Sequence, residues 1–215
     1  MASDLITFTH VREALALKHV DGLDAQMRMS PPGRRELRPS PLEQPRQSAV
    51  LILIYPQIGA GLHLILTRRT DSLRGHSGQI SFPGGRVDPE DQSPEDTAFR
   101  ETCEELGICE RTRIRVVGRL TKMWIPPSNF DVHPIVAITN SEPVLSPNPA
   151  EVAEVLHLSL QDLLDDRIKQ QTSMMLWGQA IDVPYYDVAG HVVWGATAGM
   201  LSEFEHRLKQ ILKRV

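Results

Sequence analysis

Three glutamates stand close together in the chain: Glu101, Glu104 and Glu105. On an α-helix their side chains fall within an arc of roughly 100°. Like charges at this spacing destabilise a helix by roughly a few tenths of a kcal/mol per pair, and the helix dipole disfavours acids near the C-terminal end. One interpretation is a solvated acidic face. The other is a site for a hard divalent cation, which would offset both penalties and support chemistry on a phosphorylated substrate.

The helix that carries these glutamates is expected to run from Pro94 to Leu106. Ser93 is a suitable N-cap, Pro94 suits the first helical position, and Gly107 is a good terminator. The helical period places three apolar residues on the side opposite the acids: Phe99, Cys103 and Leu106. We expect this apolar side to pack on the core.

Composition limits the class of protein. The 215 residues are enough for one domain with an appended element. The formal net charge of −4 gives no basic field for nucleic acid, and no apolar run is long enough to span a membrane. Cys103 and Cys109 lie six residues apart without histidines at ligand spacing, which predicts neither a disulfide framework nor a zinc site. A reducing, cytoplasmic setting is therefore expected.

The chain divides into two expected parts. Residues 1–47 should form an N-terminal helix, within 8–20, and a Pro/Arg-rich arm, and residues 48–215 the main domain. The apolar run 49–56 predicts a strand buried on both faces, with 61–69 as its hairpin partner. Further strands are expected at 79–83, 113–120, 132–139 and 151–160, then a helical turn, a hairpin turning at Ala189-Gly190 and a C-terminal amphipathic helix. This order predicts a mixed α/β domain without regular βαβ alternation.

The stretch "RETCEELGI" (100–108), with Gly85 upstream, resembles the core of the Nudix box. Nudix enzymes hydrolyse a nucleoside diphosphate linked to another group, using divalent metals held by this helix. The resemblance implies an α/β/α sandwich with a mixed central sheet, and Mg²⁺ or Mn²⁺ as cofactor. The interval from Gly85 to Arg100 is one residue longer than in the general box, and Asp91 stands where that box has a glutamate.

The longer interval is similar to that of the coenzyme A pyrophosphatase branch of the family. A second signature of that branch precedes the box as "LTRRTDSLRGHSGQISFPGG" (66–85), and segments 125–137 and 192–201 resemble the branch as well. The resemblance implies cleavage of the coenzyme A diphosphate into 3′,5′-ADP and (acyl-)4′-phosphopantetheine. Two alternatives stay open: a Nudix diphosphatase for ADP-ribose or (d)NTPs, and a nucleotide-binding regulator without turnover, against which the intact acid triplet argues.

The resemblance also suggests roles within the box. Glu101, Glu104 and Glu105 would hold the metal, and Glu104, Glu105 and Arg100 would form the catalytic set together with a general base. Because Arg100 lies one turn from Glu104, we expect it to hold a carboxylate in position and not to touch substrate. An ordinary surface ion pair is the alternative for this arginine.

The general base is expected from outside the box, at Glu151 or Glu154. Three residues apart on a strand, the two side chains point to opposite faces, so at most one of them faces the metals. Glu151 is nearer the preceding loop and is the favoured candidate.

Substrate-binding residues are expected before the box and in a later loop. Guanidinium groups suit bidentate phosphate recognition, and glycines allow close backbone approach to the metal site. The predicted set is Arg68, Arg69, Arg74, Gly84, Gly85 and Asn129, with the arginines reading the 3′-phosphate of coenzyme A. Each arginine could instead simply solvate a sheet edge. The expected partner is a small molecule, coenzyme A or another nucleoside diphosphate derivative, with no nucleic acid and no membrane, and the chain could form a homodimer.

Overall fold

The computed structural model describes residues 5–70, 78–176 and 178–213. Within these ranges, eight strands form one mixed sheet centred on β1 (Arg46–Gln57). β1 pairs in parallel with β7 (Phe130–Thr139), and antiparallel with β2 (Gly61–Arg69) and β4 (Gly84–Arg86). The other strands of this sheet are β3 (Ile80–Ser81), β5 (Ile114–Arg119), β6 (Met123–Ile125) and β8 (Val152–Ser159). The predicted mixed central sheet is confirmed.

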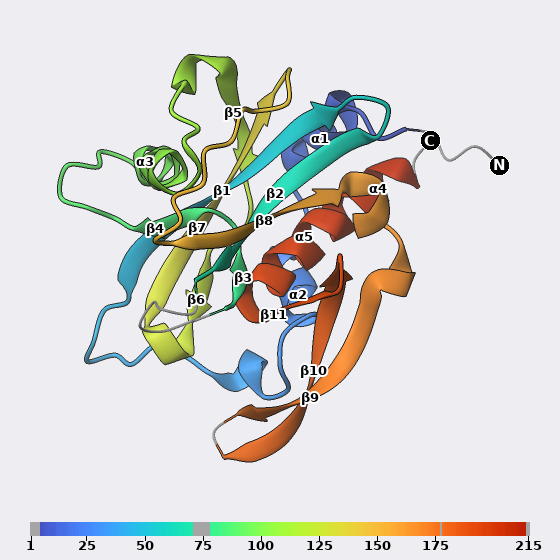
Figure 1. The fold of residues 1–215 in the computed structure, drawn as a ribbon. Coiled ribbons are helices and arrows are strands. Elements are labelled where there is room, and N and C mark those ends of the chain that lie inside the picture. Colours follow the sequence, from blue (N-terminus) through green and yellow to red (C-terminus); the bar gives the residue numbers. More distant parts are fainter. Residues whose placement is uncertain (1–4, 71–77, 177, 214–215) are drawn as a thin grey trace.

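Helices cover both faces of this sheet. In Figure 1, α3 lies on one side, and α5 with α1 and α2 lies on the other. The helices of the described part are α1 (Phe8–Ala16), α2 (Gly22–Met27), α3 (Pro94–Leu106), α4 (Leu160–Leu163) and α5 (Gly195–Leu212), with 3₁₀ turns η1 (Arg34–Glu36), η2 (Arg111–Arg113), η3 (Pro126–Ser128) and η4 (Asp166–Ile168). None of these helices is long and apolar enough to cross a membrane.

The two layers follow from the residue pattern of β1. Leu51 and Leu53 belong to the core beneath α3, whereas Ile52 and Ile54 belong to the core beneath α5. All four side chains are fully buried. A strand covered by helices on both faces needs such a continuous apolar run, which is why this strand could be predicted from the sequence.

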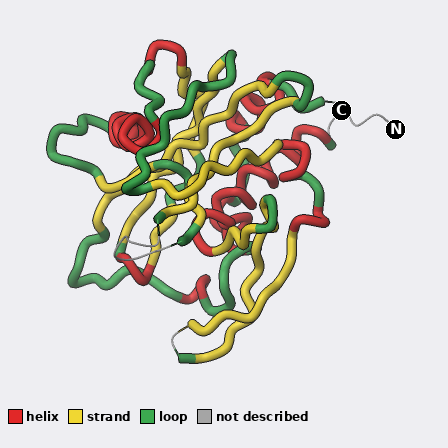
Figure 2. Tube along the Cα trace, viewed as in Figure 1, coloured by secondary structure: helices red, strands yellow, loops and turns green. Residues whose placement is uncertain are grey.

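A second, three-stranded sheet lies beside the first. It consists of β9 (Lys169–Leu176), β10 (Gln179–Val188) and β11 (His191–Trp194), all antiparallel. The predicted turn at Ala189-Gly190 joins β10 to β11. The β9–β10 hairpin projects from the body of the protein, as the strand colouring in Figure 2 shows.

The N-terminal region packs against the main domain. α1 and α2 contact α5, and buried Val11 and Ala14 belong to the same core as Leu208. After α2 the chain runs without regular structure, apart from η1, until it enters β1. The N-terminal helices therefore share the core of the main domain.

Candidate active site

The acidic helix α3 has the predicted ends. The Ser93 side chain accepts a hydrogen bond from the Asp96 backbone N–H at 3.2 Å, Pro94 opens the helix, and Gly107 ends it in the left-handed conformation with φ of 72°. A glycine is favoured at that last position because other residues are strained there. The start and end of α3 thus come from local sequence signals.

The three glutamates of α3 lie at three depths. The exposed fraction of the side chain is 3% for Glu105, 17% for Glu101 and 53% for Glu104. Glu105 is nearly as buried as Leu106, although the helical period places the two on different sides of α3. The side chain can turn inward because β4 brings a pair of glycines beneath the helix.

Gly85 leaves the space that the Glu101 carboxylate occupies, and Gly84 allows β4 to lie close to β1. A Cβ on Gly85 would lie 2.3 Å from the carboxylate carbon of Glu101. A Cβ on Gly84 would lie 2.3 Å from the carbonyl oxygen of Ala49, and Gly84 has φ of 153°. A side chain at Gly84 would push β4 away from β1, whereas a side chain at Gly85 would displace the Glu101 carboxylate.

Arg100 is the centre of an ion-pair network above β4. Its Nε and Nη2 donate to the two oxygens of Asp91 at 3.2 and 2.9 Å, and Nη2 also donates to the Arg86 carbonyl at 2.9 Å. Nη1 donates to Glu101 at 2.9 Å and to Glu104 at 3.3 Å. The Arg100 guanidinium holds the pKa of Asp91 well below its usual range. Arg100 therefore links two of the box glutamates to the loop before the helix.

The surroundings of Glu105 disfavour its charged form. Burial raises the pKa of Glu105 to about 8; Arg69 opposes the rise, and the carboxylates of Glu101 and Glu151 add to it. Burial likewise raises the pKa of Glu101. Glu105 Oε2 is buried without a hydrogen-bond partner. A divalent cation bound by oxygen ligands would satisfy that oxygen and relieve the repulsion, so these residues fit a metal.

The acids are not, however, gathered into a ready-made metal cage. Among the described residues, no three Asp, Glu, His or Cys side chains converge closely enough for that. Glu101 is instead held by Arg100, and Glu104 points toward solvent. Binding an ion would therefore draw the box glutamates together.

Glu151 and Glu154 have different surroundings. Glu151 ends the loop before β8, and its carboxylate repels those of Glu101 and Glu105. Asn148 fixes that loop to α3, because its backbone N–H donates to the Glu105 carbonyl at 2.9 Å and its Nδ2 donates to Glu151 Oε1 at 3.4 Å. Glu154 instead lies 3.4 Å from Arg68 and 3.3 Å from His191. Of the pair, Glu151 is the one near the box glutamates.

The predicted substrate-binding residues are distributed unevenly. Arg69 Nη1 lies 3.7 Å from Glu105 Oε1, whereas Arg68 forms its ion pair with Glu154. Asn129 accepts a hydrogen bond from the Trp124 indole N–H at 2.9 Å, and its backbone is left-handed with φ of 49°. Arg74 lies outside the described residues.

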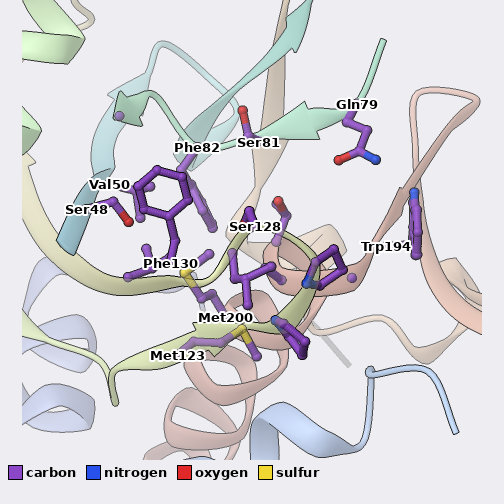
Figure 3. A pocket seen from close by; sticks show the side chains of 18 of the residues that line it. Ser48, Val50, Gln79, Ser81, Phe82, Met123, Ser128, Phe130, Trp194 and Met200 are labelled. Carbon is purple, nitrogen blue, oxygen red and sulfur yellow. The ribbon is translucent and has the colours of Figure 1, made fainter. Parts of the chain in front are cut away.

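A large cavity adjoins the glycine pair. Its volume is about 840 Å³, and its lining includes Gly84, Gly85 and Arg69. Figure 3 shows its apolar walls. They include Phe82 from the segment before β4, Met123 from β6, Phe130 from β7 and Met200 from α5. Trp194 and the start of α5 close another part of the wall. The cavity is large enough for a nucleotide-sized ligand beside the acidic helix.

Comparison with known proteins decides the family. The NUDIX domain model matches residues 45–177. The chain belongs to the Nudix family. It is 32% identical over 184 residues to the "Uncharacterized Nudix hydrolase NudL" of Photorhabdus laumondii, covering 86% of this chain and 94% of that one. The NudL protein of Pectobacterium atrosepticum is 35% identical over 184 residues, covering 78% and 86%.

Other Nudix proteins extend the comparison. Nudix hydrolase 22 of Arabidopsis thaliana, chloroplastic, is 32% identical over 164 residues, which are 74% of this chain and 54% of the plant protein. The crystal structure of a MutT/nudix family protein from Enterococcus faecalis has a TM-score of 0.54 at 14% identity, covering 95% of this chain and 75% of that one. This last likeness shows the fold. Family membership makes the protein a Nudix hydrolase that is expected to use a divalent metal ion.

One prediction about the Nudix helix is wrong. Cys103 and Cys109 form a disulfide, with their Cα atoms 4.6 Å apart. Six residues along a continuous helix would separate the two cysteines by roughly 9 Å. Gly107 ends α3 in the left-handed conformation instead, which turns the chain back and returns Cys109 to the last helical turn.

Sequence reasoning also left some residues of the site unassigned. Asp91 stood out only as a departure from the general box, yet it is the bidentate partner of Arg100. Arg46, at the start of β1, lines the cavity. Arg34 of the arm lines it too, and for the arm the sequence left both a phosphate-binding role and a solvated linker open. The Pro/Arg-rich composition of the arm was the available signal, but composition alone does not place a side chain in a cavity.

Proposed function

We propose that this Nudix hydrolase cleaves the diphosphate bond of coenzyme A or its acyl derivatives, giving 3′,5′-ADP and (acyl-)4′-phosphopantetheine, with Mg²⁺ or Mn²⁺ bound. The observation that carries the proposal is the cavity beside Gly84 and Gly85. Its lining has several apolar side chains, four arginines and no aspartate or glutamate among the described residues. Such walls suit a long ligand that joins several phosphate groups to an extended, weakly polar chain.

The box glutamates would hold the metal. Glu101 and Glu105 are the principal candidates, with Glu104 able to join them by a change of its exposed side chain. When bound, the ion would neutralise charge on the diphosphate oxygens and acidify a bound water. Arg100 would hold Glu101 in place, since it spans Glu101 and the buried carboxylate of Asp91.

The remaining chemistry would be positioning and proton transfer. Arg69, which faces both the cavity and Glu105, would bind a diphosphate oxygen. Glu151 would take the proton from the attacking water as the new P–O bond forms and the bridging P–O bond breaks. Its carboxylate is suited to this step because it lies near Glu101 and Glu105 on a loop fixed to α3.

Product analysis tests the proposal directly. The protein is incubated with Mg²⁺ and, in parallel, coenzyme A, ADP-ribose or dATP. Release of adenosine 3′,5′-bisphosphate without turnover of the other two substrates is expected. Turnover of ADP-ribose or dATP but not coenzyme A would instead establish a different Nudix diphosphatase, and absence of turnover with all three would favour a binding regulator. Glu105→Gln, prepared identically, excludes a contaminating phosphodiesterase.

A further inference from the structure

The N-terminal arm forms part of the cavity wall. Ser30, Pro31, Arg34 and Leu37 line it, although all four precede residue 45, where the match to the Nudix domain begins. Gly33, with φ of 77°, turns the chain into the 3₁₀ turn η1 that starts at Arg34. The cavity is therefore completed by a segment that belongs to this chain and lies outside the family match.

Arg34 is fixed on the β6 side of the cavity. Its Nη2 donates to the Trp124 carbonyl, and its guanidinium carbon lies 5.5 Å from the centroid of the Trp124 ring. A guanidinium stacked on an aromatic ring is pre-organised, so it loses little further freedom on binding an anion. Arg69, by contrast, faces Glu105 of α3. The two arginines thus approach the cavity from different elements.

Arg34 has no carboxylate partner within the described part of the chain. Among the described residues, no aspartate or glutamate forms an ion pair with it, whereas the next residue, Arg35, pairs with Asp24 at 2.6 Å. Burial lowers the pKa of Arg34. A half-buried guanidinium without a counter-charge is costly unless an anion binds to it.

A second arginine, Arg46, contacts the β6–η3–β7 hairpin that also holds Arg34. Arg46 Nη2 donates to the Ser128 carbonyl at 2.6 Å, and its guanidinium lies 4.2 Å from the centroid of the Phe130 ring. Like Arg34, it is held by a carbonyl and an aromatic ring of the β6–η3–β7 segment, with no carboxylate partner in the described part of the chain. The cavity therefore has positive charge at this hairpin in addition to Arg69 beside α3.

We propose that Arg34 is a specificity-determining residue that binds a phosphate monoester of the substrate, separate from the diphosphate that is cleaved beside α3. This identification rests on the proposed function: with coenzyme A as substrate, the phosphate monoester is its 3′-phosphate. Arg34 of the arm would thus bind the 3′-phosphate in place of the sequence-predicted Arg68, Arg69 and Arg74, and Arg69 would bind the diphosphate. Arg68 is already engaged by Glu154.

The test compares ligands that differ only in that phosphate. Binding of 3′,5′-ADP and of 5′-AMP is measured by calorimetry for the wild type, Arg34→Gln, Arg34→Lys and Arg35→Gln. Arg34→Gln should weaken 3′,5′-ADP binding by about ten- to a hundredfold, the usual cost of one charged phosphate contact, and change 5′-AMP binding by less than about twofold. Arg34→Lys, which keeps the charge without the planar fork, should fall between. Arg35→Gln, outside the cavity, should resemble the wild type with both ligands.

The outcomes separate this inference from the proposed function. Equal weakening of both ligands in Arg34→Gln, or a wild type that does not distinguish them, would overturn the role of Arg34. If Arg34→Gln does not fold, the ratio of the affinities for 3′,5′-ADP and 5′-AMP in Arg34→Lys decides instead. A third outcome is also informative: the wild type does not cleave coenzyme A but prefers 3′,5′-ADP to 5′-AMP, and Arg34→Gln lacks that preference. This result would refute the proposed function and would still support the phosphate site at Arg34.

Discussion

The backbone of Gly85 lies directly beneath the Glu101 carboxylate, so close that a Cβ there would be 2.3 Å from its carboxylate carbon. Favourable carbon–carbon contacts begin near about 3.5 Å, so no side chain fits between them. Arg100 holds the same carboxylate from the other side at 2.9 Å. The position of Glu101 is thus set by a glycine below it and an arginine beside it.

Gly85→Ala should therefore lower turnover by about a hundredfold, because it displaces Glu101, which we propose as a metal ligand, and so misplaces the reacting atoms. The measurement is kcat with coenzyme A at saturating Mg²⁺. Gly118→Ala is the matched control, since its Cβ would meet Leu15 of α1 at 2.9 Å and disturb packing away from the box. Turnover of Gly85→Ala within twofold of the wild type would show that Glu101 has no fixed role.

Glu105→Gln should be less active but, without metal, more stable. Turnover should fall by at least about a hundredfold, as expected on removing a strong electrostatic stabiliser. The folded-state pKa of Glu105 is raised to about 8 by burial. Between roughly pH 4.5 and 8 the unfolded chain has lost this proton while the folded protein retains it, so the stability of the wild type falls as pH rises through that window. Because glutamine has no proton to lose in this range, Glu105→Gln should not show this fall in stability.

The check is urea unfolding in EDTA at pH 5 and pH 8. The stability gain of Glu105→Gln over the wild type should be small at pH 5 and reach the order of a few kcal/mol at pH 8. Glu104→Gln, at the exposed position of the same helix, should show no such gain. Added Mg²⁺ should stabilise the wild type and leave Glu105→Gln nearly unchanged. A constant gain across pH would contradict a buried, proton-binding Glu105.

Much of the fold could be predicted because its signals are local. The α3 bounds follow from Ser93, Pro94 and Gly107, and β1 follows from an apolar run. Strand β9 was missed because its residues Lys169–Leu176 are largely polar and half exposed, without the apolar pattern of a core strand. β4 and β6, of three residues each, are defined by their pairing with β1 and β7 and have no pattern of their own.

The candidate site could be predicted only in part from the sequence, because much of its geometry depends on tertiary contacts. Spacing identified Glu101, Glu104 and Glu105, but their depths depend on β4 beneath the helix, which is a tertiary contact. The disulfide depended on a backbone reversal at Gly107. Arg34 reaches the cavity only because the arm folds back across Trp124. Local periodicity contains none of this information.

Glu203 should contribute strongly to stability without acting in catalysis. It is fully buried and accepts hydrogen bonds from Gln26 Nε2 at 2.8 Å, the Thr121 backbone N–H at 3.0 Å and Arg207 Nε at 2.9 Å. Glu203→Ala leaves the buried Arg207 charge unpaired and should cost about 3–5 kcal/mol in unfolding free energy. Denaturant unfolding measures this. Glu110→Ala, which breaks an exposed pair with Arg113, should cost less than about 1 kcal/mol.

The choice between Glu151 and Glu154 gives a kinetic prediction with an internal control. The Glu151 carboxylate repels those of Glu101 and Glu105, and its loop is fixed to α3 through Asn148. Removing a general base lowers turnover by about a hundredfold or more while substrate binding is kept. We therefore expect Glu151→Gln to lower kcat with little change in KM.

Glu154→Gln should have kcat close to that of the wild type, because Glu154 is engaged by Arg68 and His191. Its effect should be limited to the small stability change typical of a partly exposed ion pair. Both variants are measured with coenzyme A at saturating Mg²⁺, and metal titrations check that each still binds the ion. A Glu154→Gln enzyme slower than Glu151→Gln would contradict the assignment of Glu151 as the base and would favour Glu154.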